Sequence, residues 1–167
     1  DVEIDKSFDW SISKESSFNS INYGLNDILI PLLKKHQIKS TFFISPEVLE
    51  NDKCVKTLLK NKNNNIEFAT HLHAEFVEPE RLLFISNMSG QKADKFQTEY
   101  SNEIEYLKLK SLTELFYSKF GYNPFSFRAG RYATRKSTYD NLINLSYKID
   151  CSETPGLKWK NNDYVID

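Results

Sequence analysis

The stretch IEFATHLHAEF, residues 66–76, joins a strand pattern to two of the three histidines of the chain. Its first half, 66–70, is rich in β-branched and aromatic residues, as is typical of a β-strand. His71 and His73 follow directly, and residues two positions apart in an extended segment face the same way. The stretch therefore predicts a strand whose carboxyl end presents two imidazoles side by side.

Strand and helix patterns alternate outward from this stretch. We expect strands at 2–5, 40–45, 66–70, 125–128 and 147–152, and helices at 21–36, 53–61, 100–120 and 134–145. Pro31 should kink or split the first helix, and Gly121 should close the third. Residues 71–95 show no periodicity and are expected to form a long loop. The alternation predicts an α/β fold, with a parallel sheet and helices on its faces.

The composition narrows the classes of protein. A chain of 167 residues that is 40% hydrophobic is the size of one globular domain, spanning 1–167. Its net charge of −1 gives no electrostatic case for binding nucleic acid. No apolar run approaches the roughly 20 residues that a membrane-spanning helix needs. Cys54 and Cys151 match no metal-binding spacing and are expected to be buried thiols, although a disulfide stays open.

Ionisable residues gather at the expected strand ends. In parallel sheets, sites lie at the carboxyl ends of the strands. Asp1 and Glu3 flank the first strand, His71 and His73 follow the third, and Arg128 ends the fourth. Two imidazoles and a carboxylate form a recurrent zinc set that leaves one position for water. The alternatives are two loop histidines bonded to the backbone and an arginine in an ordinary salt bridge.

Four further residues have open roles. Arg131 is expected to be exposed or to face a substrate. Glu75 is either a third ligand from the loop or a solvated charge, and we expect the solvated charge. Trp10 and Trp159 lie in loop-like segments, where they line a sugar cleft or cap the core.

Several segments, taken in order, carry a family resemblance. They are KSTFFIS (39–45), THLHAEF (70–76), EIEYLKLKSLTELFYSKFGYNP (103–124), SFRAGRY (126–132) and YKIDCSETPGLKW (147–159). Together they resemble the polysaccharide deacetylase superfamily (NodB homology, carbohydrate esterase family 4), and most closely a bacterial branch found near surface-polysaccharide genes. The resemblance implies a distorted (β/α) barrel, incomplete at its C-terminus in this chain. It also implies a divalent metal, usually zinc, and removal of an N-acetyl group from a carbohydrate substrate.

The resemblance also implies roles for individual residues. His71 matches the first metal-binding histidine of the family. The second family histidine falls on Glu75, so His73 is expected to replace it as a ligand. Asp1 is implied as the catalytic base and Glu3 as the remaining ligand, with an exchange of these two roles left open.

The segment 128–132 matches the arginine motif of the family. Arg128 is implied to orient the catalytic aspartate, and the backbone N–H near Arg131 to stabilise the oxyanion. Arg131 and Tyr132 are the expected substrate-binding residues. The catalytic-acid histidine of the family has no counterpart before Asp167, and we expect the chain to be a fragment or processed form.

Other functions and properties stay open at this stage. One alternative is a polysaccharide-binding module of the same fold that has lost catalysis. Another is a metal-dependent hydrolase of a different amide or ester. The sequence leaves the compartment open between the bacterial cytoplasm and the cell envelope, and it does not fix the oligomeric state.

Overall fold

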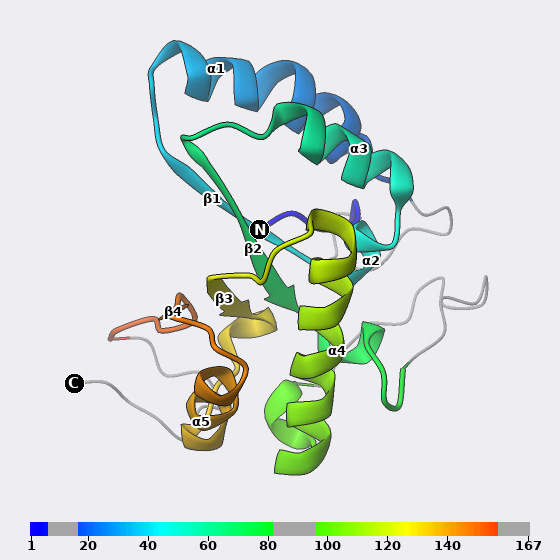
Figure 1. The fold of residues 1–167 in the computed structure, drawn as a ribbon, viewed down its shortest axis with the longest axis vertical. Coiled ribbons are helices and arrows are strands. Elements are labelled where there is room, and N and C mark those ends of the chain that lie inside the picture. Colours follow the sequence, from blue (N-terminus) through cyan, green and yellow to red (C-terminus); the bar gives the residue numbers. More distant parts are fainter. Residues whose placement is uncertain (7–16, 82–95, 157–167) are drawn as a thin grey trace.

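A four-stranded parallel sheet organises the computed structural model, which describes residues 1–6, 17–81 and 96–156 (Figure 1). Its strands are β1 (Ser40–Ile44), β2 (Ile66–Leu72), β3 (Ser126–Ala129) and β4 (Ile149–Asp150). They lie side by side in chain order, and every neighbouring pair is parallel. The predicted α/β class with parallel strands is therefore confirmed.

Helices connect the strands and cover the sheet. They are the π-helical η1 (Ser20–Leu29), the α-helices α1 (Ile30–Lys35), α2 (Pro46–Leu49), α3 (Asp52–Asn61), α4 (Asn102–Phe120) and α5 (Lys136–Asn144), and the 3₁₀ turns η2 (Ala74–Phe76), η3 (Gln97–Glu99) and η4 (Gly130–Tyr132). Pro31 lies in the first turn of α1, and the expected interruption appears as a change from the π-helical η1 to α1, with a helical backbone on both sides of the junction. Gly121 caps α4 in the left-handed conformation with φ 76°, as its position predicts. No helix in the described part of the chain has the length and apolar character to cross a membrane.

The expected first strand is reduced to a single parallel bridge between Val2 and Ile44. The prediction of a strand at 2–5 is wrong because Asp5 turns the chain away from the sheet. Its carboxylate accepts hydrogen bonds from the backbone N–H of Asn19 at 2.7 Å and of Ser20 at 3.1 Å. Residues 1–4 nevertheless stay beside β1, so Asp1 and Glu3 reach its carboxyl end.

The later strands differ from the prediction at their ends. β2 continues to Leu72, so His71 lies within the strand rather than in the loop after it. β4 is limited to two residues because Ser152 meets β3 through its side chain, accepting a hydrogen bond from Ala129 N–H at 2.8 Å. Residues 82–95 of the expected loop lie outside the described residues, as do Trp10 and Trp159.

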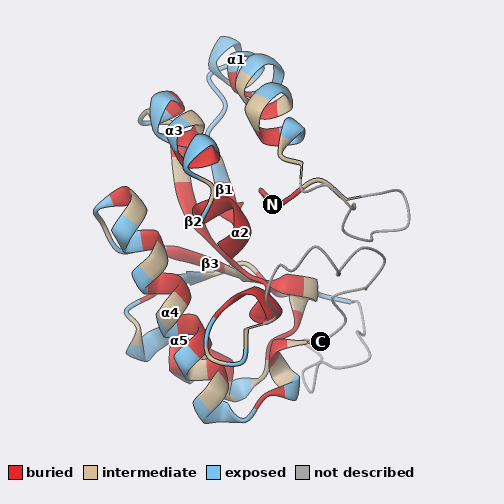
Figure 2. Cartoon of the chain, turned by 90° about the vertical axis from the view of Figure 1, so that its right-hand side faces the viewer, coloured by how far each residue is buried: buried red, intermediate tan, exposed pale blue. Residues whose placement is uncertain are grey.

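The hydrophobic core joins residues of the sheet and α4 to residues of η1, α1, α2 and α3 (Figure 2). Phe68 and Leu72 of β2, Phe127 of β3, and Leu112 and Phe116 of α4 are all almost completely buried. α4 packs on β2, α5 packs on α4, and α3 packs on η1.

The two cysteines are free thiols. Cys54 lies in the core, as predicted, whereas Cys151 is only partly buried.

A buried lysine of α4 fastens the segment that follows β2. The Nζ of Lys108 donates to the carbonyl oxygens of Ala74 at 2.8 Å and Val77 at 2.7 Å, and also to that of Pro79. The same ammonium lies 4.6 Å from the centre of the Tyr100 ring. Because a buried charge is tolerated when its hydrogen bonds are made, Lys108 gives residues 74–79 a fixed path next to the end of the sheet.

Candidate metal centre

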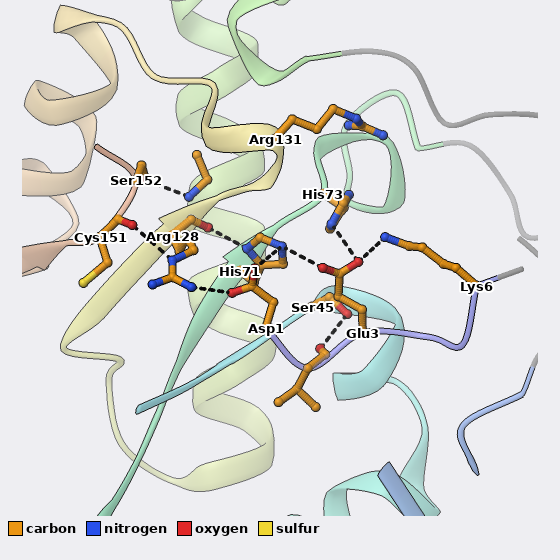
Figure 3. Close-up of polar contacts among 12 residues, drawn as sticks. Asp1, Glu3, Lys6, Ser45, His71, His73, Arg128, Arg131, Cys151 and Ser152 are labelled. Atoms are coloured by element: carbon orange, nitrogen blue, oxygen red, sulfur yellow. Dashed lines mark hydrogen bonds and ion pairs between the residues drawn. The ribbon is translucent and has the colours of Figure 1, made fainter. Parts of the chain in front are cut away.

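Three side chains converge at the carboxyl ends of β1 and β2. The Nε2 of His71 lies 3.3 Å from Oε1 of Glu3, and the Nε2 of His73 lies 3.3 Å from Oε2 of Glu3 (Figure 3). The ligand atoms of all three residues lie within 4.8 Å of one another. Both imidazoles are buried and meet edge to face, with ring centres 4.8 Å apart. Glu3, His71 and His73, which the sequence predicts to be neighbours, therefore lie together in the structure.

The register of the sheet sets the orientation of His71. His71 is paired with Arg128 across β2 and β3, and its Nδ1 lies 3.0 Å from the Arg128 carbonyl oxygen. A carbonyl only accepts, so Nδ1 carries the hydrogen and Nε2 presents its lone pair to Glu3. Burial lowers the pKa of His71, which favours this neutral form.

The charges inside the cluster keep Glu3 ionised and favour a positively charged partner beside it. Burial opposes ionisation of Glu3, but the imidazoles of His71 and His73 outweigh it and hold the pKa of Glu3 far below its usual range. Burial likewise opposes a charged His73, but contacts with Glu3 and Glu75 raise the pKa of His73 to about 9. The cluster is therefore built around an ionised carboxylate that attracts a cation.

The donor set fits a divalent metal. Ligand atoms of a tetrahedral zinc, each about 2.0–2.1 Å from the ion, lie roughly 3.3 Å apart. His71 Nε2 lies at this distance from Oε1 of Glu3, and His73 Nε2 lies at this distance from the other oxygen, Oε2. In addition, the Nε2 of His73 is buried and has no hydrogen-bond partner among the residues that the structure describes. Glu3, His71 and His73 could thus hold one ion, and these three are the candidate ligands.

Asp1 lies beside this cluster and is held by Arg128. The Nη1 of Arg128 donates to Asp1 Oδ1 at 3.0 Å, and its Nε donates to the Cys151 carbonyl oxygen at 3.0 Å. The guanidinium also lies 4.3 Å from the centre of the Phe43 ring. The other oxygen of Asp1, Oδ2, lies 3.9 Å from His71 Nε2. Arg128 has the carboxylate partner that its sequence context predicts, and that partner borders the candidate metal centre.

Glu75 lies in a different environment from the one predicted. It is completely buried, so the expectation of a solvated charge is wrong. Its Oε1 accepts a hydrogen bond from Arg131 Nη2 at 2.8 Å, and this ion pair makes burial of the carboxylate tolerable. The two residues are 56 positions apart in the chain, so no local pattern points to the pair.

Arg131 and Tyr132 form a strained turn after β3. Their φ angles are 55° and 54°, in the left-handed region that non-glycine residues rarely adopt. Both side chains are partly exposed. Their role in binding a substrate stays a prediction.

Gly130 begins this turn where no side chain fits. A Cβ at this position would lie 2.5 Å from the Leu72 carbonyl oxygen and 3.4 Å from His73 Nδ1. The absence of a Cβ therefore lets the ends of β2 and β3 approach each other at the candidate metal centre.

Gly130→Ala is expected to lower the free energy of unfolding by about 2–3 kcal/mol, because the added methyl overlaps a backbone oxygen. Chemical denaturation of the metal-free protein measures the loss. Gly24→Ala is the matched control, since a Cβ there meets nothing within 4 Å and Gly24 lies in a helix. An equal effect of the two substitutions would contradict the steric argument.

Two other charged residues near the cluster were missed by the sequence analysis. Lys6 pairs with Glu3 Oε2. Glu47, in α2, is buried, and neither of its carboxylate oxygens has a hydrogen-bond partner among the described residues. Its negative charge contributes to the raised pKa of His73. A glutamate that follows Pro46 in a short helix carries no sequence signal for such a position.

No family model matches the sequence, and neither does any curated protein. Solved structures do match. A CE4 family pseudoenzyme from Bacillus anthracis is 15% identical, with a TM-score of 0.52, and the match covers 73% of this chain and 36% of that one. A mutant of this pseudoenzyme with restored enzymatic activity matches at 16% identity and the same TM-score, over 73% and 37% of the two chains.

A third match is a mutant of the peptidoglycan deacetylase PdaC from Bacillus subtilis. It is 13% identical, with a TM-score of 0.50, over 75% of this chain and 50% of that one. The chain thus spans between 36% and 50% of the length of these proteins. These likenesses show that the chain has the fold of the CE4 polysaccharide deacetylases, as the resemblance of the sequence implied. Because the matches include a pseudoenzyme, the fold does not decide between catalysis and its loss.

Proposed function

We propose that the protein is a metal-dependent hydrolase that removes N-acetyl groups from an amino sugar or polysaccharide, with zinc as the metal. The observation that carries the proposal is the arrangement of Glu3, His71 and His73 around one point, with the Asp1–Arg128 pair at its border. Metal-dependent hydrolysis of an amide requires a bound metal ion and an adjacent, oriented carboxylate that acts as a base, and this arrangement could supply both. The shared fold with a peptidoglycan deacetylase supports an acetylated sugar as the substrate.

Each residue has a defined task in this reaction. Glu3, His71 and His73 would hold the metal, which when bound polarises the amide carbonyl and lowers the pKa of water toward about 7. Asp1 accepts the proton of the water that attacks the acetamide carbon. Arg128 donates to Oδ1 of Asp1, which leaves Oδ2 on the side of the cluster to receive that proton. The C–N bond then breaks as the proton held by Asp1 passes to the leaving nitrogen, which gives acetate and the free amine.

The turn after β3 completes the proposed site. The backbone N–H near Arg131 would donate to the oxyanion that forms on the attacked carbonyl. One such donor is worth roughly 3 kcal/mol of transition-state stabilisation. Arg131 and Tyr132 would contact the sugar.

Acetate release from N-acetylated amino-sugar oligomers tests the function directly. The expected result is release that stops when a chelator removes the metal and returns when zinc is added. Simple acetylated amides and esters serve as competing substrates. Faster release from these than from the sugars would assign the protein to a different class of hydrolase.

Polysaccharide binding without catalysis is the second candidate function. It is favoured by the pseudoenzyme among the structural matches and by a glutamate at the position of the second family histidine. In this case the protein would bind the acetylated oligomers in a titration and release no acetate, even with metal bound.

A further inference from the structure

Glu75 and Arg131 lie on the side of His73 that faces away from the candidate metal centre. The Oε1 of Glu75 is 3.6 Å from His73 Nδ1, whereas His73 Nε2 faces Glu3 at 3.3 Å. Arg131 Nη2 donates to the same Oε1 at 2.8 Å. A single oxygen atom of Glu75 therefore faces both the imidazole and the guanidinium.

Each imidazole of the cluster has an oxygen acceptor on its Nδ1 side. His71 has the main-chain carbonyl of Arg128 at its Nδ1, supplied by the register of the sheet. His73 lies beyond the end of β2 and has no such strand neighbour. The carboxylate of Glu75 occupies the equivalent position at the Nδ1 of His73. In metal sites, a group of this kind sets which ring nitrogen faces the ion.

We propose that Glu75, locked in place by Arg131, is a positioning residue that directs the Nε2 of His73 toward the metal. The proposal rests on the metal-binding part of the proposed function and adds to it a role for the residue that stands where the family has a histidine.

The geometry separates this role from that of a ligand. Glu75 does not belong to the group whose ligand atoms lie within 4.8 Å of one another. Its Oε1 is already engaged by Arg131, on the Nδ1 side of the ring. Complete burial and the ion pair restrict rotation of the carboxylate, which is what a positioning group requires.

Cobalt(II) binding to the metal-free protein tests the proposal. Its affinity measures ligand strength, and its visible d–d absorption reports the coordination geometry without any need for activity. We expect Glu75→Ala to weaken binding about 10- to 100-fold and to change the absorption spectrum. Glu75→Gln should fall between Glu75→Ala and the wild type, because its side-chain carbonyl can still accept from Nδ1–H.

Glu105→Gln is the matched control. Glu105 is also completely buried, and its Oε2 accepts from Arg135 Nε at 2.9 Å, but its partners include no histidine. It should lower the melting temperature, as Glu75→Gln should, and leave cobalt affinity and the spectrum unchanged. A merely structural role for Glu75 would make the two variants alike.

Several outcomes overturn the proposal. Wild-type cobalt affinity and an unchanged spectrum in Glu75→Ala would do so, as would an equal loss in Glu105→Gln. If the wild type binds cobalt but releases no acetate, the proposed function fails while the role of Glu75 stands. If the wild type binds no metal, both fail.

Discussion

His71→Ala and His73→Ala are each expected to abolish stoichiometric metal binding. The cluster offers three candidate ligands, so each substitution leaves only one imidazole and one carboxylate. Both histidines are buried and reach the same carboxylate at 3.3 Å, and no other described side chain belongs to the group that could replace them. Elemental analysis after dialysis against zinc measures the result, with about one equivalent expected for the wild type.

His36→Ala provides the control for this prediction. His36 is the third histidine of the chain and lies exposed at the end of α1. Its removal should leave the metal content unchanged. Full retention of metal in a His71→Ala/His73→Ala double mutant would rule out the ligand assignment and favour the alternative of two histidines with a structural role.

Arg128→Ala is expected to lower the turnover of acetylated sugar by about 10²-fold or more while the metal stays bound. The side chain of Arg128 binds Asp1 and the Cys151 carbonyl, whereas His71 is held by the main-chain carbonyl of Arg128, which the substitution keeps. The loss should therefore fall on kcat, because Asp1 is no longer held in orientation. Acetate release and metal content, measured on the same samples, separate the two effects.

Guanidinium ion supplies a sharper test of Arg128. Added to Arg128→Ala, it should restore part of the lost turnover by occupying the space between Asp1 and the Cys151 carbonyl. The Arg128→Lys variant should have a lower turnover than Arg128→Ala with added guanidinium, because an ammonium lacks the planar fork that reaches both acceptors. Loss of metal together with turnover would show that Arg128 supports the cluster as a whole and does not act through Asp1.

The convergence of Asp1, Glu3, His71 and Arg128 could be predicted because it follows from topology. The carboxyl ends of neighbouring parallel strands meet at one edge of a sheet, so residues placed there by the strand pattern become neighbours. Gly121 and Pro31 were equally predictable, since each acts on the backbone of its own helix.

The surroundings of the cluster could not be predicted in this way. Glu75 pairs in the interior with Arg131 from another strand end, and the sequence around Glu75 shows no periodicity that would place it there. The prediction of a first strand at 2–5 was wrong for a related reason. The side chain of Asp5 accepts hydrogen bonds at the start of η1, and this contact overrides the strand pattern. Pairings between distant side chains follow from the folded chain and have no local periodicity.

The hydrogen bonds from Lys108 to residues 74–79 determine what the path of this segment depends on. Lys108 holds the segment through three carbonyl oxygens, and every amino acid supplies a carbonyl. The anchor itself therefore does not depend on which side chains the segment carries, even though residues 74–77 are buried for other reasons. A single lysine in the helix behind the segment thus fixes the backbone beside the candidate metal centre, whatever side chains the segment carries.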